Sequence, residues 1–276
     1  MREVWRAIAS RKLTVLAAVA LAAIALAAIF AAALAGYDPV EQSLLSMDEP
    51  PSADHWLGTD QFGRDVLARI VFGARASLIL GLLAPAIAGI IGTVLGLIGG
   101  YFGGWPDRVL GRLMDLLLAF PALLLGILVA AALSSGFWSM VAVLTIALAP
   151  RFARIARAST LTLRHEPFIE AAVAAGVGHP TIILRHVLPN IAGSIAVVLT
   201  LWIATAIRLE ATLSFLGLGT QPPAPSWGNI IRDGLGNMYA SAWPIIAAGV
   251  AITVTVLALN IVGDTVRDVL DPETRA

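Results

Sequence analysis

The chain carries few side chains that could perform covalent chemistry. It has no cysteine and a single lysine, Lys12, so a thiol nucleophile and the phosphate-binding loop Gly-x-x-x-x-Gly-Lys-Ser/Thr are both absent from the sequence. The four histidines, His55, His165, His179 and His186, do not have the spacing of metal ligands on a helix face. We therefore predict a protein that is not an enzyme, with no catalytic residue, no metal site and no cofactor of its own.

The most distinctive polar segment follows residue 165. Pro167 suits the first turn of a helix, and Glu166 and Glu170 suit the positively charged N-terminal end of that helix. Gly176 suits the left-handed backbone conformation in which many helices end. This pattern predicts a helix of one to two turns whose alanines would let another surface approach closely, namely Ala171, Ala172, Ala174 and Ala175, with apolar anchors at Phe168, Ile169 and Val173. The alternative is a solvated hairpin that only joins two membrane spans.

A second helical piece is expected to begin at His179-Pro180 and to run over 181–188. Pro189-Asn190 should break it before the next apolar run, because proline lacks the N–H that a helix interior needs. Near this break, a capping or hydrogen-bonding role is expected for His186.

The composition places these segments in a membrane protein. With 58% hydrophobic and 13% charged residues over 276 positions, the chain has too little polar surface to coat a soluble globule. Six apolar runs approach the ~20 residues that a helix needs to cross hydrocarbon, at 13–36, 76–100, 113–133, 137–158, 193–215 and 242–264. We predict an all-α membrane protein with an N-terminal part, 1–75, and a five-span core, 76–276, that contains a loop at 159–192.

The first span is expected to stay as an anchor rather than to be cleaved as a signal peptide. The net charge of zero gives no reason to expect nucleic acid as a partner.

Arginine and lysine predict the orientation. Thirteen of them fall on one side if the N-terminus is inside, namely Arg2, Arg6, Arg11, Lys12, Arg108, Arg112, Arg151, Arg154, Arg157, Arg164, Arg185, Arg267 and Arg275. The other side keeps Arg64, Arg69, Arg75 and Arg232. Both termini and the Glu170 segment are therefore expected in the cytoplasm, and 37–75 and 217–241 outside.

A family resemblance adds to this reading. Glu170-Ala171-Ala172, three residues, Gly176, nine residues, and then His186 two positions before Leu188-Pro189 resemble the cytoplasmic coupling loop of ABC importer permeases. Residues 55–65 and 210–223 resemble the second permease of dipeptide, oligopeptide and nickel importers. The resemblance implies a type I ABC importer-like fold in a bacterial inner membrane, in which Glu170, Ala171, Ala172, Gly176, His186 and Pro189 receive the motion of ATPases.

The same resemblance implies partners. These are membrane lipid, a homologous permease that completes the path, two ATP-binding subunits that hold ATP and Mg²⁺, and an extracytoplasmic substrate-binding protein. Di- or oligopeptides are the favoured substrate, with nickel or another small solute left open. Residues expected to contact the binding protein or to form a gate are His55, Gly58, Asp60, Gly63, Arg64, Asp65, Pro222, Pro223 and Trp227. The proline-rich stretch 221–228 should be extended and present Trp227 at the membrane interface, although a purely structural role of both loops stays open.

An ionisable side chain within a membrane span is energetically costly, so each one in this sequence calls for a structural or functional role. Arg208 and Glu210 are two apart on a helix, so they should not pair, and they are candidates for lining the path. Asp115 and Asp264 are expected at the inner membrane surface. The rival function is an ion-coupled secondary transporter in which Asp115, Glu210 or Asp264 carries protons, and a membrane-embedded enzyme is a weaker third. Glycines along the second span, at positions 81, 89, 92, 96, 99 and 100, predict close helix contacts within this chain or with a second permease.

Overall fold

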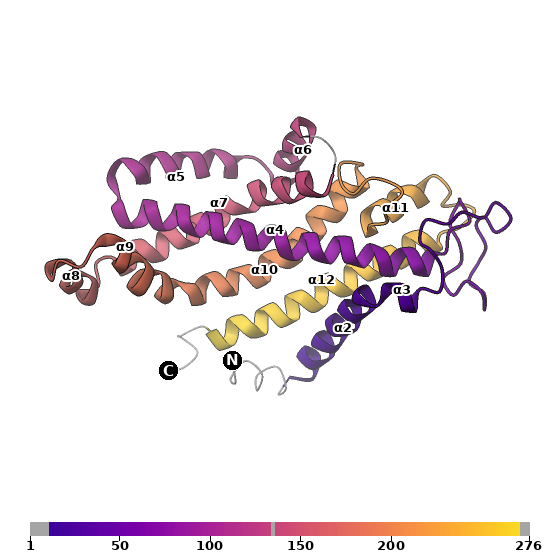
Figure 1. The fold of residues 1–276 in the computed structure, drawn as a ribbon, viewed down its shortest axis with the longest axis horizontal. Coiled ribbons are helices and arrows are strands. Elements are labelled where there is room, and N and C mark those ends of the chain that lie inside the picture. Colours follow the sequence, from indigo (N-terminus) through magenta and orange to yellow (C-terminus); the bar gives the residue numbers. More distant parts are fainter. Residues whose placement is uncertain (1–10, 134–135, 271–276) are drawn as a thin grey trace.

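A computed structural model describes residues 11–133 and 136–270, and these ranges fold into helices joined by loops (Figure 1). Arg2, Arg6 and Arg275, which contributed to the predicted orientation, lie outside the described residues. The elements are α2 (Lys12–Ile29), α3 (Ala31–Leu34), α4 (Val66–Phe102), α5 (Gly104–Ala119), α6 (Ala122–Ala132), α7 (Phe137–Leu163), α8 (Pro167–Ala174), α9 (His179–Ile182), the π-helix η1 (Ile183–Val187), α10 (Leu188–Phe215), α11 (Trp227–Leu235) and α12 (Trp243–Leu270).

Five helical segments in the described part are long and apolar enough to cross a membrane. They are Lys12–Ile29, Val66–Phe102, Phe137–Leu163, His179–Phe215 and Trp243–Val269. The sixth candidate is α5 together with α6, which are bent by 98° relative to each other. The predicted all-α membrane architecture is thus confirmed.

The third predicted span, 113–133, is not one helix. Phe120 has extended backbone angles (φ −83°, ψ 134°), and the chain turns there before α6 begins. Pro121 explains the break, because a proline ring disfavours helical angles in the residue before it. Pro85 and Pro150 lie inside α4 and α7 without ending them, and both are buried between helices, whereas Pro121 is exposed.

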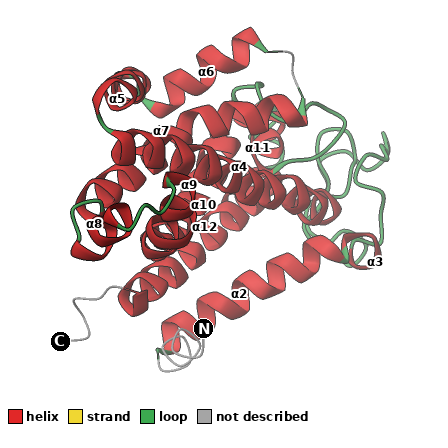
Figure 2. Ribbon diagram, turned by 60° about the vertical axis from the view of Figure 1, so that its left-hand side comes forward, coloured by secondary structure: helices red, strands yellow, loops and turns green. Residues whose placement is uncertain are grey.

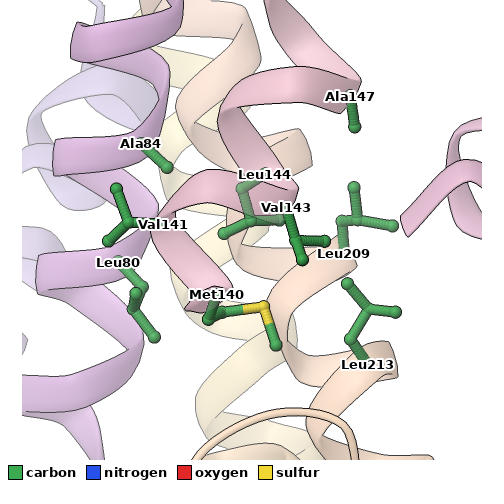
Figure 3. Close-up of a cluster of buried hydrophobic side chains, with 9 residues drawn as sticks. All are labelled: Leu80, Ala84, Met140, Val141, Val143, Leu144, Ala147, Leu209 and Leu213. Carbon is green, nitrogen blue, oxygen red and sulfur yellow. The ribbon is translucent and has the colours of Figure 1, made fainter. Parts of the chain in front are cut away.

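The core is built around α4 and α7. Where these helices meet, a Cβ atom on Gly92 or Gly96 would overlap the backbone of α7 at Ala149 and Ala153. The predicted close helix contacts of this glycine-rich span therefore occur within this chain. Figure 3 shows one buried cluster at this interface, in which Leu80 and Ala84 of α4 face Met140, Val141 and Leu144 of α7. Leu209 and Leu213 bring α10 into the same cluster.

The bundle is elongated, and its two ends differ. Helices α8 and α9 lie at one end, while the loop that precedes α4 and the helix α11 lie at the other (Figure 1). Figure 2 shows α6 projecting from the bundle beside α5. Helix α2 packs along α12, where Thr14 and Thr265 share a hydrogen bond of 3.0 Å and Arg11 pairs with Asp268 at 2.7 Å. The predicted inner and outer segments therefore occupy opposite ends of the molecule.

Candidate functional site

Helix α8 has the form predicted from the sequence. Glu166 is its N-cap, Pro167 opens its first turn, and Glu170 lies in that first turn. The helix ends before Gly176, whose φ of 73° is left-handed, as expected for glycine after a helix. The chain then begins α9 at His179, so α8 stands as a separate short helix at the end of the bundle (Figure 1).

Most of α8 is exposed. Glu170, Ala171, Ala174 and Ala175 lie on the surface, and Ala172 is half-buried. Phe168 and Val173 leave 44% and 48% of their area exposed, which is unusual for large apolar side chains on so short a helix. Small residues beside exposed apolar ones give a surface on which another protein backbone can approach closely.

Ile169 is the buried residue that fastens α8 to the bundle. Ile169 is only 2% exposed and packs in a cluster with Ile182 of α9, Val187 of η1 and Ile191 of α10. Leu97 of α4 and Ala156 of α7 complete the buried part of this cluster. We call these six residues the inner apolar cluster. Because it joins α8 to the ends of α4, α7 and α10, a displacement of α8 would be passed to three long helices.

The predicted break at Pro189 is wrong. The chain stays helical from His179 to Phe215, and Pro189 occupies the first turn of α10. The reason is the π-helix η1 just before it, whose wider turn removes the need for the hydrogen bond that proline cannot make. His186 lies within η1, where its carbonyl accepts a 2.6 Å hydrogen bond from the Asn190 side chain. The part of the predicted loop after residue 178 is therefore an extension of the fifth span.

At the opposite end, four charged residues form a buried network that we call the outer clamp. It consists of Asp60, Arg64, Arg69 and Asp233, which come from the loop before α4, from α4 itself and from α11. Asp60 Oδ2 lies 2.7 Å from Arg64 Nε and 3.4 Å from Arg69 Nε. Asp233 Oδ2 lies 3.6 Å from Arg64 Nη2 and 3.5 Å from Arg69 Nη2. The side chains of Asp60, Arg64 and Arg69 are at most 7% exposed.

A second polar group next to the clamp fixes the start of α4. Asp65 caps the helix by accepting a 2.7 Å hydrogen bond from the Ala68 N–H, and its other oxygen lies 2.9 Å from His55 Nδ1. Gly58 and Gly63 both have left-handed φ angles, and a Cβ on either would overlap the backbone at Glu49 or Ser43. These glycines are therefore needed to fold the loop.

Most of the residues of this segment that were expected to contact a binding protein or to form a gate are buried in this structure, and that role stays a prediction. Gly58, Asp60, Gly63, Arg64 and Asp65 are buried, and His55 keeps partial exposure. Their side chains and backbone face one another because the loop must satisfy its charges and polar groups without water.

The second outer loop also differs from the prediction. Trp227 is 1% exposed rather than presented at the membrane interface, and its Nε1 donates a 3.0 Å hydrogen bond to the Ile70 carbonyl. Ser226 and Asn229 explain this inward placement, because together they form a capping box that starts α11 at Trp227. Pro222 and Pro223 are exposed and lie in a turn rather than in an extended segment.

Glu210 and Arg208 lie on different faces of α10, as predicted. Glu210 is fully buried, and its carboxylate accepts hydrogen bonds from Ser77 of α4 at 3.0 Å and from Ser214 at 2.7 Å. Arg208 is exposed and donates to Thr205 at 3.3 Å. In this conformation Glu210 is closed off within the chain, so of the two only Arg208 is open to a partner or a path.

The charged residues near the α8 end pair across helices. Asp115 of α5 lies 2.9 Å from Arg154 of α7, and both side chains are well exposed. Asp107 of α5 accepts from Arg157, with Oδ2 and Nη2 2.7 Å apart. Asp264 is exposed near the end of α12. Within the described ranges, no three His, Cys, Asp or Glu side chains are arranged to hold a metal ion.

Sequence reasoning missed two sets of residues. Arg69 and Asp233 complete the outer clamp although they are 164 positions apart, so no local pattern connects them. Arg151 of α7 places its guanidinium 4.8 Å from the centre of the Trp202 ring of α10. The position of Arg151 inside an apolar run indicated that it needs a partner, but nothing in the sequence identified Trp202 as that partner.

Comparisons with known proteins agree on one family. Residues 92–276 match the family model "Binding-protein-dependent transport system inner membrane component", and residues 1–51 match "N-terminal TM domain of oligopeptide transport permease C". The glutathione transport system permease protein GsiD of Escherichia coli O157:H7 is 41% identical over 274 residues, which cover 99% of this chain and 90% of that protein. The dipeptide transport system permease protein DppC of Alkalihalophilus pseudofirmus is 40% identical over 275 residues, covering 100% of this chain and 90% of that protein.

A solved structure supports the fold. A chain of the MetNI methionine ABC transporter in an inward-facing conformation superposes with a TM-score of 0.56 and 21% identity, over 72% of this chain and 95% of that one. At this identity the match is evidence for the arrangement of helices alone.

Proposed function

Because the chain belongs to the family of binding-protein-dependent transport system inner membrane components, we propose that it carries short peptides inward through a path that it forms with a second permease. It is a multi-pass inner membrane protein of the peptide-importing ABC type, and a transport component rather than an enzyme. Proteins of this kind work with ATP-binding subunits, a partner permease and a binding protein. The family membership favours this function over the ion-coupled transporter considered above.

The observation that carries the proposal is the construction of α8. A short helix with an alanine surface projects from the end of the bundle, and its single buried anchor, Ile169, enters the inner apolar cluster. Such a helix offers a surface for a partner and a mechanical connection to three spans. Neither feature is needed in a loop that only connects two helices.

We infer the following mechanism from this arrangement. Two ATP-binding subunits hold ATP and Mg²⁺ and close on nucleotide binding, and one of them receives α8 in a surface groove. Ala171 and Ala172 permit close approach, Glu170 meets the subunit surface, and Gly176 sets the turn that aims the helix. The inner apolar cluster then transfers the displacement of α8 to α4, α7 and α10, which switches the path between an outward and an inward opening.

The substrate is inferred from the names of the relatives. Glutathione and dipeptides are both short peptides, so a cargo of two or three residues fits both relatives. Nickel and other small solutes are the competing cargoes, and a transport assay decides among them. The binding protein is expected to dock on exposed parts of the outer loops such as Pro222 and Pro223, because the outer clamp is buried.

Orientation can be tested directly, because the chain contains no cysteine and every introduced thiol is unique. Ala171→Cys lies on α8, and Leu45→Cys lies at a position that is 98% exposed in the outer loop. With a membrane-impermeant maleimide, we expect the first thiol to react only in inside-out vesicles and the second only in right-side-out vesicles. The reverse pattern would contradict a cytoplasmic α8.

Transport is tested in proteoliposomes that hold the full complex. A labelled dipeptide offered with the binding protein should enter only when ATP and Mg²⁺ are on the ATPase side. Uptake driven by an ion gradient without nucleotide would support the secondary transporter instead. Uptake of nickel ions but not of dipeptide, in the same vesicles, would leave the permease function intact and overturn the proposed substrate.

A further inference from the structure

A cavity of about 270 Å³ opens between α4, α5 and α7 near the α8 end of the bundle. Gly96 and Gly99 of α4 form part of its wall, which leaves room because neither has a side chain. Leu95, Leu110 and Met114 contribute apolar surface. The remaining lining is mostly charged, which is unusual for a space between membrane helices.

The charges in the cavity do not balance. Four arginines and two aspartates line it, namely Arg108, Arg112, Arg154, Arg157, Asp107 and Asp115. Each aspartate is already engaged, Asp107 by Arg157 and Asp115 by Arg154. Arg108 and Arg112 therefore provide two positive charges that lack a carboxylate in the described part of the chain. They lie one turn apart on α5, so both face the same side.

These two arginines have donors to spare. Arg108 uses Nε for a 3.2 Å hydrogen bond to the Gly104 carbonyl, which leaves its terminal nitrogens free. Among the described residues, Arg112 makes no hydrogen bond or ion pair. Two exposed guanidinium groups with free N–H donors form a geometry that suits the oxygens of a phosphate.

The depth of the cavity points to the lipid headgroups. Its wall on α4 lies within the last turns of that helix, at the end of the apolar run 76–100. Along α5, Trp105, Val109, Leu113 and Leu116 form an exposed apolar stripe at helical spacing, between 42% and 69% exposed. A helix with such a stripe faces hydrocarbon, and a Trp at its end suits the membrane interface. The cavity thus opens beside lipid at headgroup level.

We propose that this cavity binds the phosphate of an anionic phospholipid, with Arg108 and Arg112 donating to the phosphate oxygens. Basic pockets between membrane helices are known to take such headgroups. The glycerol part would lie against Leu110 and Met114, and the acyl chains would follow the apolar stripe of α5. The site is independent of the transported substrate, so it stands or falls separately from the proposed function. Inorganic phosphate shares the chemistry but not the apolar contacts.

The test uses the full complex in nanodiscs of phosphatidylcholine with 30% phosphatidylglycerol, a probe composition chosen for the experiment. Phosphatidylglycerol retained after transfer to detergent is counted by native mass spectrometry. At about 1 kcal/mol per arginine near a membrane surface, the double variant Arg108→Gln/Arg112→Gln should bind the lipid roughly tenfold to thirtyfold more weakly. The control Arg11→Gln/Arg267→Gln removes two exposed charges, one from the residue before α2 and one from α12, and should retain the lipid.

Two further arms make the result decisive. Arg108→Lys/Arg112→Lys keeps both charges and should restore part of the lipid retention. This variant therefore distinguishes a loss of lipid caused by lost charge from one caused by misfolding. Inorganic phosphate at 10 mM should fail to displace the lipid. Equal retention in the wild type and the Gln double variant would overturn the proposal. Displacement of the lipid by inorganic phosphate would overturn it as well, by assigning the site to a soluble anion.

Discussion

The two ends of this bundle are held together by different forces. At the outer end, the outer clamp joins a loop, α4 and α11 through buried charges. At the α8 end, Ile169 and its neighbours in the inner apolar cluster join α8 to the long helices through apolar contacts. Ion pairs demand fixed distances and angles, whereas the attraction between apolar side chains has no preferred direction. The outer end is therefore suited to stay rigid while the α8 end moves.

This difference explains why the predicted site residues at the two ends differ in burial. Most of the predicted site residues of the first outer loop are buried because they hold the loop together, and most residues of α8 are exposed because nothing in the described part of the chain covers them. A polar motif in a loop can thus have a structural purpose, while a short alanine-rich helix can be the surface that a partner uses.

The largest effect is expected from Asp60→Asn. This change keeps the shape of the side chain but removes the negative charge that Arg64 and Arg69 share. Within the outer clamp, Asp233 would then be the one carboxylate left beside two buried guanidinium groups, at distances of 3.5 Å or more. The free energy of unfolding should fall by about 3–5 kcal/mol. Denaturant titration of the protein in detergent micelles measures this difference.

Asp115→Asn is the matched control, because it breaks an ion pair whose partners are 62% and 71% exposed. It should change the free energy of unfolding by less than about 1 kcal/mol. Equal losses in the two variants would show that burial of the outer clamp is not what makes it strong, and the contrast between the two ends would fail.

The outer clamp also shows what the sequence could not predict. Asp60 and Arg64 are four apart, yet they lie in a loop, and Arg64 also lies near Asp233, which comes from a helix distant in the sequence. In contrast, Pro167 and Gly176 act on their own backbone and define α8 almost completely. Local signals predicted α8 correctly, and long-range charge pairing was beyond them.

Prolines show the same limit within the spans. Pro121 ends a helix, whereas Pro85 and Pro150 do not, although all three share one local chemistry. The difference lies in packing, because the buried prolines are supported by neighbouring helices that compensate for the lost hydrogen bond. The position of six spans could thus be predicted from composition, but not which of them would bend.

The next effect in size is that of Ile169→Ala, which empties the anchor of α8. Leaving a cavity in the inner apolar cluster should cost about 2–5 kcal/mol, mostly as local detachment of α8. Hydrogen exchange of the α8 amides should accelerate while amides near the outer clamp keep their protection. Exchange that accelerates equally at both ends would mean that the inner apolar cluster supports the whole bundle rather than α8.

A smaller loss is expected from Gly176→Ala. The methyl group would meet no atom within 4 Å, so the cost arises only from the left-handed φ of 73°. That cost is about 1–2 kcal/mol for an L-residue. Gly111→Ala, at a helical position that also has open space, serves as the control and should be neutral or slightly stabilising. If the two substitutions had equal effects on unfolding, the turn after α8 would not depend on glycine.

The smallest effect on stability, and the most informative one for function, is expected from Ala171→Leu. Ala171 is exposed on α8, so the larger side chain should fit beside the described residues of this chain and change the free energy of unfolding by no more than about 0.5 kcal/mol. If a partner approaches this face as closely as we propose, the same change should abolish ATP-dependent uptake. Ala158→Leu, on an exposed face of α7, is the matched control and should retain uptake. Normal uptake by the Ala171→Leu protein would show that no partner approaches the alanine surface closely. The proposal that α8 receives the motion of the ATPases would then fail.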